Sequence, residues 1–245
     1  MVIRKHLVAN ADLERLWAAL VASLSLFLPA CHTDGEISQR RQEQSVNTKD
    51  NIVFQADFKA DASRLLIHYR VQNGQATTVY LLNRVFRSVG PGVTKIHKDF
   101  AYVYVDPQRI VVEKAIPAIP PGVSPYEPLA PLVTPVRPGT SFEEVIELSL
   151  PIHDTRPYAG SPPSDTPTPV SQVQLIIGYM VSPEGTTERT ETIFGEPVIL
   201  FRAPPGKLPA AGRLEVQKPI VSFGTNKNVE VLAFLPKPTK VPPPP

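Results

Sequence analysis

From residue 51 onward, apolar and polar side chains alternate along the chain with a period of two. In the first run, Ile52, Phe54 and Phe58 fall on one parity, and Gln55 and Asp57 fall on the other. Successive side chains of a strand point to opposite faces, so this alternation is typical of a half-buried β-strand. The same pattern, together with turn residues, predicts about ten strands, over 52–58, 65–71, 77–83, 100–105, 109–115, 142–150, 173–179, 187–194, 198–201, 214–217 and 229–234.

The predicted fold is an all-β, antiparallel β-sandwich with long proline-rich loops. No segment after residue 50 keeps a helical period, and two sheets with one apolar face each are stabilised by packing those faces together. We expect an immunoglobulin-like arrangement, since such sandwiches have about seven to nine strands. A closed β-barrel is the alternative. Turn residues predict a hairpin over residues 64–83, around Asn73-Gly74, and a second between 100–105 and 109–115, around Asp106-Pro107.

Proline is unusually abundant, at 29 of 245 residues. Proline cannot donate to a strand ladder and breaks helix interiors, so this composition favours strands joined by stiff loops. Fourteen of the prolines lie between Ile116 and Val170. They predict one long connection over residues 116–141 and a second insert over 155–170, both projecting from the sandwich. Long loops inside compact domains are often functional.

The first thirty residues follow a different pattern. Arg4 and Lys5 place positive charge near the start, and residues 16–30 form an apolar run without charge. This run of 15 residues is shorter than the roughly 20 that a membrane-spanning helix needs. It ends at Ala30, directly before Cys31, which is the single cysteine of the chain. These are the parts of a secretory signal peptide, with a buried N-terminal helix as the alternative.

The sequence Leu28-Pro29-Ala30-Cys31 resembles the lipobox of bacterial lipoproteins, in which the signal peptide is removed just before the cysteine. The resemblance implies that the Cys31 sulfur carries diacylglycerol and that the new amino group is acylated. Two or three acyl chains give stable membrane attachment, at about 0.8 kcal/mol per buried methylene. The residue after the cysteine is His32 rather than Asp. The resemblance therefore implies the periplasmic face of the outer membrane, with the cell surface as the alternative.

Four segments are expected along the chain. Residues 1–30 form the signal peptide, and residues 31–50 form a flexible tether that contains almost no large apolar side chain. Residues 51–235 form one β-sandwich domain, and residues 236–245 form an extended proline-rich tail. A short helix over residues 36–44 is the alternative for part of the tether.

The charge balance limits the classes of partner. Without residues 1–30, the chain has 22 Lys and Arg against 21 Asp and Glu, a net charge near +1 with both signs interleaved. No basic block stands out, so nucleic acid is not an expected partner. Once Cys31 is lipidated, no thiol is left for a disulfide. The expected partners are the membrane, through the lipid on Cys31, and another envelope protein.

No arrangement of residues predicts catalysis, a cofactor or a metal site. His153 and Asp154 are adjacent, but neighbouring side chains of an extended segment point apart and make a poor base and orienting group. His97 and Asp99 share a parity, yet two ligands do not make a metal site. Gly90-Pro91-Gly92 has no helix after it, so it does not resemble a phosphate-binding loop.

Two further groups of residues are candidates for function. Glu143 and Glu144 are adjacent and lie on opposite strand faces, so they cannot act as a catalytic pair. Glu144 has the parity of the apolar residues, and we expect it to reach solvent at the start of its strand. Tyr102 and Tyr104 share one face of a strand whose other face is also apolar, which predicts either a fully buried strand or, with Tyr126, a partner-binding aromatic surface.

The sequence thus predicts a lipid-anchored envelope domain that acts as a non-enzymatic binding or structural module. An enzyme, or an enzyme-regulating domain such as a protease inhibitor with a rigid proline loop, is the alternative. β-Sandwiches host many functions, so fold alone does not decide between them.

Overall fold

The computed structural model describes residues 47–49, 51–90, 93–97, 100–122, 131–155, 157–158, 163–193 and 195–237, all of which lie in the compact unit Glu43–Pro245. These residues form strands and turns and contain no helix, so the all-β class predicted from the sequence is confirmed. Within these ranges, the structure has no helical segment with the length and apolar character needed to cross a bilayer.

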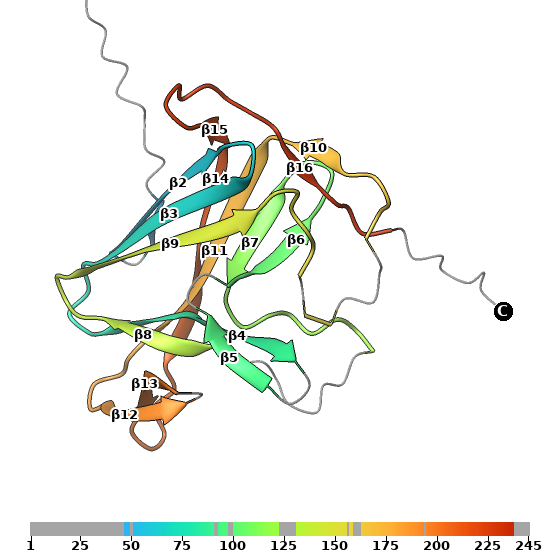
Figure 1. The fold of residues 1–245 in the computed structure, drawn as a ribbon. Helices are drawn as coiled ribbons and strands as arrows, with labels where there is room; N and C mark the ends of the chain where they lie inside the picture. The colour runs from blue at the N-terminus through green and yellow to red at the C-terminus, as the bar shows by residue number, and fades with distance from the viewer. Residues whose placement is uncertain are drawn as a thin grey trace, which may run out of the picture. The chain divides into compact units, whose positions relative to one another are not determined.

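The smaller of the two main sheets has the strand order β1-β2-β3-β9 (Figure 1). Its neighbours pair antiparallel, and the short strand β15 adds a parallel pairing to the end of β2. Within the described residues, β9 is the last strand of this sheet and pairs with β3 alone. The bounds are β1 Asn47–Lys49, β2 Ile52–Ala60, β3 Arg64–Asn73, β9 Ser141–Ser149 and β15 Val221–Ser222.

The larger sheet has the order β12-β13-β8-β4-β11-β7-β6, with β14 beside β11 and β5 beside β4. β7 and β11 pair parallel, which is an exception to the antiparallel pattern expected from the sequence. The bounds are β4 Val79–Gly90, β5 Val93–His97, β6 Tyr102–Val105, β7 Ile110–Lys114, β8 Leu132–Val136, β11 Gln172–Val181, β12 Thr187–Ile193, β13 Glu196–Arg202 and β14 Ala210–Pro219. A separate two-stranded ladder joins β10 Thr168–Val170 to β16 Val231–Ala233.

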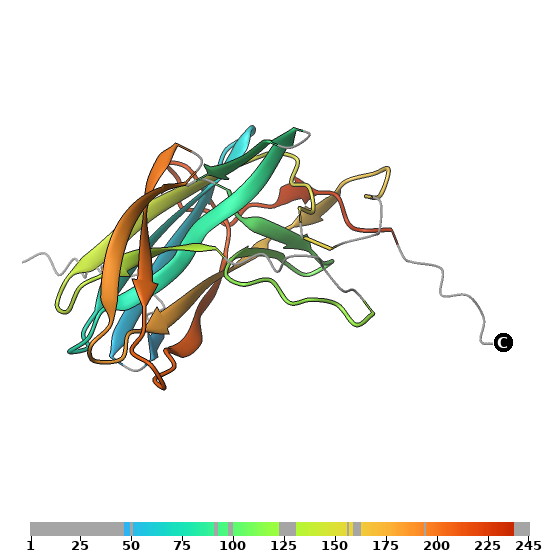
Figure 2. The same cartoon turned by 90° about the horizontal axis from the view of Figure 1, so that it is seen from below.

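The two main sheets pack face to face through one apolar core. Alternate side chains of β2, including Phe54 and Phe58, belong to the same buried cluster as Leu175 and Ile177 of β11. Neither sheet closes on itself within the described residues, so the predicted β-sandwich is confirmed and the barrel alternative is not observed. Figure 2 views the same strands from below, from the side on which β12 and β13 lie in Figure 1.

The larger sheet divides at Gly178, in the middle of β11. On one side of β11, β14 pairs along the whole strand. On the other side, β7 pairs with residues 173–177 and β4 pairs with residues 179–181. A Cβ at Gly178 would lie 2.9 Å from the Ala115 Cβ and 3.0 Å from the Leu82 Cδ1. Glycine is therefore required where the ends of two strands converge on a third.

The two predicted hairpins have different outcomes. The hairpin between 100–105 and 109–115 is confirmed, because β6 and β7 pair antiparallel around Asp106. The hairpin predicted over residues 64–83 is wrong, because β3 lies in the smaller sheet and β4 in the larger one. Asn73 explains the difference: its buried amide donates to the carbonyls of Thr77 and Val136, which fixes a crossing between the sheets rather than a tight turn.

Two predicted connections contain strands. β8 lies within residues 116–141, and β10 lies within residues 155–170. Pro135 is tolerated in β8 because β13 pairs with β8 only at Val133, which leaves the strand a single neighbour at the proline. β1 lies within the predicted tether 31–50, so strand pairing already begins at Asn47 and not at the expected boundary of 51. Backbone pairing alone, without apolar alternation, produces this strand.

Candidate functional site

The end of the larger sheet carries a hairpin whose attachment is limited by proline. β12 and β13 pair over their full length, but β13 contacts the β8 ladder through one pair of residues, Ile199 and Val133. Continuing that antiparallel register by two residues would place Pro197 opposite Pro135, and continuing it the other way would reach Pro131. Proline offers no N–H to a ladder, so the two strands separate on both sides of the single pair.

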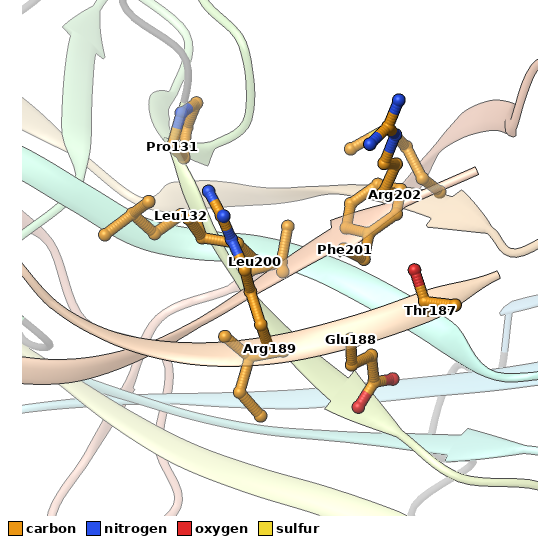
Figure 3. A pocket seen from close by; sticks show the side chains of 11 residues that line it. Pro131, Leu132, Thr187, Glu188, Arg189, Leu200, Phe201 and Arg202 are labelled. Atoms are coloured by element: carbon orange, nitrogen blue, oxygen red, sulfur yellow. The ribbon is translucent and has the colours of Figure 1, made fainter. Parts of the chain in front are cut away.

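A cavity of about 570 Å³ lies where β13 separates from β8. Its volume is within the range of about 300–1,000 Å³ that is usual for ligand pockets. The wall is mostly apolar, and Thr187, Arg189 and Arg202 add polar groups. In Figure 3, the side chains of Glu188 and Arg189 point to opposite sides of β12. The cavity is lined by Pro131, Leu132, Val133, Met180, Thr187, Glu188, Arg189, Ile199, Leu200, Phe201 and Arg202.

A small second core holds the hairpin against the outer face of the larger sheet. Tyr80, Leu82 and Val133 are buried there, and Met180 and Phe201 pack on them. The rings of Tyr80 and Phe201 are stacked, with centroids 4.3 Å apart and planes 9° apart. Since Tyr80 lies on β4 and Phe201 on β13, this stack fixes the hairpin where the β8 ladder does not.

An ion pair completes this attachment. Arg137 donates to both oxygens of Glu188, at 2.6 Å and 2.5 Å, and the Tyr80 hydroxyl donates to Glu188 Oε1 at 2.5 Å. The hydrogen bond from Arg137 is the main reason that the pKa of Glu188 is lowered, and the Tyr80 hydroxyl acts in the same direction. Burial is the main reason that the pKa of Tyr80 is raised. Glu188 is therefore an ionised carboxylate whose two oxygens are both engaged.

The two arginines at the cavity differ in their contacts. Arg189 pairs with Glu191 at 2.8 Å, and its side chain is 72% exposed. Arg202 is exposed and lies across the hairpin from Thr187. An apolar wall beside exposed guanidinium groups can bind an apolar group that carries neighbouring negative charge.

A second hollow, of about 420 Å³, lies on the other side of the Glu188 ion pair. Glu188 lines both hollows, and Tyr80 and Arg137 line the second. The remaining walls come from the turn after β3 and the turn after β11, including Thr77 and Glu184. Glu188 thus lies between the two hollows, and its partners Arg137 and Tyr80 lie on the side of the second.

Between the two sheets lies a separate, buried polar cluster. Lys114 Nζ donates to Glu144 Oε2 at 2.7 Å, and the Tyr69 hydroxyl donates to the same oxygen at 2.5 Å. Lys114 and Tyr69 are fully buried, and the Glu144 side chain is 9% exposed. The expectation that Glu144 reaches solvent is wrong, because its parity aims it across the core at a lysine of the opposite sheet.

Of the residues predicted to form a partner-binding surface, Tyr102 and Tyr104 lie together on β6. Tyr102 is buried and contacts Phe100 edge to face, with ring centroids 5.8 Å apart, and Tyr104 is half-buried. Burial raises the pKa of Tyr102 to about 12, and its hydroxyl has no hydrogen-bond partner among the described residues. Tyr126 and Cys31 lie outside the residues that the structure describes.

The remaining candidates from the sequence stay apart. His153 stacks on Phe234, with ring centroids 4.7 Å apart, and His68 faces Glu143 on the outer side of the smaller sheet. His97 lies at the end of β5, and Asp99 is outside the described residues. In the part of the chain that the structure describes, no group of three or more His, Cys, Asp or Glu side chains is placed to hold a metal.

The residues around the hairpin cavity have no marked signal in the sequence. Arg137 and Glu188 are 51 residues apart, and neither belongs to a recognisable motif. The prolines at 131, 135 and 197 were a detectable signal, because they restrict the ladder that β8 and β13 can form. Comparison of the chain with protein-family models, with curated proteins and with solved structures found no match.

We expect Glu188→Gln to lower the free energy of unfolding by about 1 kcal/mol at neutral pH, because it removes the charge that Arg137 binds. A carboxyl with a lowered pKa stabilises the fold above its ordinary pKa of 4.5, and this stabilisation is lost as pH falls through the lowered value. Urea unfolding at several pH values should therefore show the wild type and variant converging in acid. Glu196→Gln, an exposed change in the same hairpin, is the control. A difference that does not depend on pH would contradict the role of the charge.

We expect Tyr102→Phe to leave the free energy of unfolding unchanged or to raise it by up to about 1 kcal/mol, because the buried hydroxyl makes no hydrogen bond with any residue that the structure describes. Tyr69→Phe is the matched variant, since its hydroxyl donates to Glu144, and it should lower stability by about 1–3 kcal/mol. Urea unfolding measures both. Equal losses in the two variants would contradict this distinction.

Proposed function

We propose that this chain is a lipid-anchored β-domain of the bacterial cell envelope that binds another envelope protein at the β12–β13 cavity. The anchor is Cys31, whose sequence context resembles a lipobox. The polar segment after the anchor, which contains almost no large apolar side chain, would let the domain reach a partner at some distance from the membrane. The outer membrane is the proposed location, with the domain at the periplasmic face.

One observation carries the binding proposal: the cavity of about 570 Å³ combines an apolar wall with exposed arginines. Leu132, Met180 and Phe201 provide apolar contact, and Arg202 provides charge. Pockets of this composition favour a partner group that is apolar with acidic neighbours, because the apolar part gives affinity and the charge gives orientation.

The state of Glu188 favours binding over a reaction that needs a free acid or base. It is the one carboxylate in the cavity lining, and both its oxygens accept hydrogen bonds from Arg137 and Tyr80. A general base must have a free lone pair facing the proton that it removes. Glu188 instead holds the hairpin in place and so preserves the shape of the cavity.

We expect Cys31→Ala to move the protein from the membrane fraction to the soluble fraction, because the residue that carries the lipid is removed. Cell fractionation with a high-salt wash measures this. Protease treatment of intact cells with the native protein distinguishes the periplasmic face from the cell surface, since the outer membrane protects only the former. Continued association of the Cys31→Ala variant with membranes after the wash would contradict the anchor.

For the binding site, a photo-crosslinking amino acid at Thr187 should give a specific product in living cells, because this position lies at the cavity. Arg202→Glu should abolish this product, since it reverses the charge that faces the partner. Lys227→Glu changes an exposed cation in the turn after β15 and should leave the product unchanged. A product that persists in Arg202→Glu would contradict the proposed site.

A further inference from the structure

The division of the larger sheet at Gly178 brings the ends of β4 and β7 together. Leu82 on β4 and Ala115 after β7 both approach Gly178, as the 3.0 Å and 2.9 Å contacts of a Cβ built there show. Asn83 follows Leu82, and Lys114 precedes Ala115. Both of these side chains are fully buried. β4 and β7 do not pair with each other, yet they place the Asn83 amide and the Lys114 amine in the same part of the interior.

Glu144, on β9 of the smaller sheet, supplies a carboxyl group to this part of the interior. Its Oε2 accepts a hydrogen bond from Lys114 Nζ at 2.7 Å and one from the Tyr69 hydroxyl at 2.5 Å. Glu144 and Tyr69 are direct neighbours across the β3–β9 ladder, so the backbone fixes their relative position. An amine and a carboxylate are therefore held in contact out of water, where proton transfer between them yields two neutral groups.

Asn83 lies beside Tyr69. Among the described residues, neither its Nδ2 nor its Oδ1 has a hydrogen-bond partner of ordinary geometry. Burial and the contact with Glu144 raise the pKa of the Tyr69 hydroxyl, and burial is the larger cause. The nearby Asn83 amide acts in the opposite direction. A buried amide without partners costs about 1–3 kcal/mol, and native proteins contain few of them. Such a group calls for an explanation in terms of the chemistry around it.

We propose that Lys114 and Asn83 become joined by an amide bond between their side chains, with Glu144 as the proton carrier. The amine, the amide and the acid that this condensation requires are the three groups that the fold collects at the division of the larger sheet. Tyr69 is a positioning residue, because it orients Glu144 through its hydrogen bond.

The reaction balances without any further reagent. Lys114 first transfers a proton to Glu144, which leaves a neutral amine and a carboxylic acid. Nζ then attacks Cγ of Asn83, and the Cγ–Nδ2 bond breaks. One more proton from Nζ goes to Nδ2 by way of the Glu144 carboxyl, and ammonia leaves. The products are the Nζ–Cγ amide, ammonia and protonated Glu144, so that the reaction needs no oxidant, metal or cofactor.

The bond would close the larger sheet at the point where its hydrogen bonding is interrupted. β4 and β7 both border β11 but have no ladder between them. A covalent link between them would prevent their separation when the sandwich is pulled or heated. The reaction needs only folding to bring the groups together, since it replaces a buried ion pair and an unpartnered amide with one neutral bond.

Peptide mass spectrometry of the full-length purified protein tests this proposal. Proteolysis should release a branched species in which the peptide with Asn83 is joined to the peptide with Lys114. Its mass should be lower by one ammonia than the sum of the two linear peptides. Two separate linear peptides from the folded wild type, with no branched species, would overturn the proposal and leave the cluster as an ion pair only.

Variants separate the chemistry from folding. Glu144→Gln keeps the size of the side chain but cannot carry the proton, so the branched species should be lost while circular dichroism still shows a folded β-protein. Lys114→Met removes the amine and should also abolish it. Lys218→Met is the matched control: Lys218 pairs with Asp57 and donates to the Ala56 carbonyl, away from Asn83, so the branched species should remain. A branched species that persists in Glu144→Gln would overturn the role of Glu144.

Discussion

A lysine and a glutamate meet between the sheets, in a core that is mostly apolar, and their contact links one sheet to the other. Lys114 ends a strand of the larger sheet, and Glu144 lies near the start of a strand in the smaller one. Burial of each charge costs several kcal/mol, which their contact and the Tyr69 hydrogen bond must offset. Loss of either partner would leave an uncompensated charge in the core. The pair therefore selects one relative placement of the sheets, whereas apolar contacts alone tolerate several.

The sequence predicts the parts of this fold that depend on local pattern. Alternation identifies β2, β3, β9 and β11, because their apolar parity is also their buried parity. Alternation does not predict strand pairing where contacts between residues distant in the sequence determine it. β3 and β4 look like a hairpin around Asn73-Gly74, yet the buried Asn73 amide ties this turn to Val136, 63 residues away. The hairpin cavity was not predicted for the same reason, since one wall comes from β8 and the others come from β11, β12 and β13, much later in the sequence.

Proline has a second role here besides stiffening loops. Prolines interrupt β8 and flank the single pair that joins it to β13, so a sheet that could have continued opens into a cavity instead. Stacked rings and one ion pair replace the missing ladder. Side-chain contacts can be changed one at a time without loss of the sheet, so this end of the molecule can vary in shape while the sandwich is retained.

The free edge of β9 has a consequence for the behaviour of the protein at high concentration. An exposed strand of this length is a template for pairing with another chain. Val145 is the exposed apolar residue near its centre, and Glu143 and Glu147 stand on either side of it on the same face. If two copies paired antiparallel around Val145, Glu143 of each would lie opposite Glu147 of the other. Like charges directly opposite are destabilising, so the two glutamates oppose the pairing of this edge with a second copy of the chain.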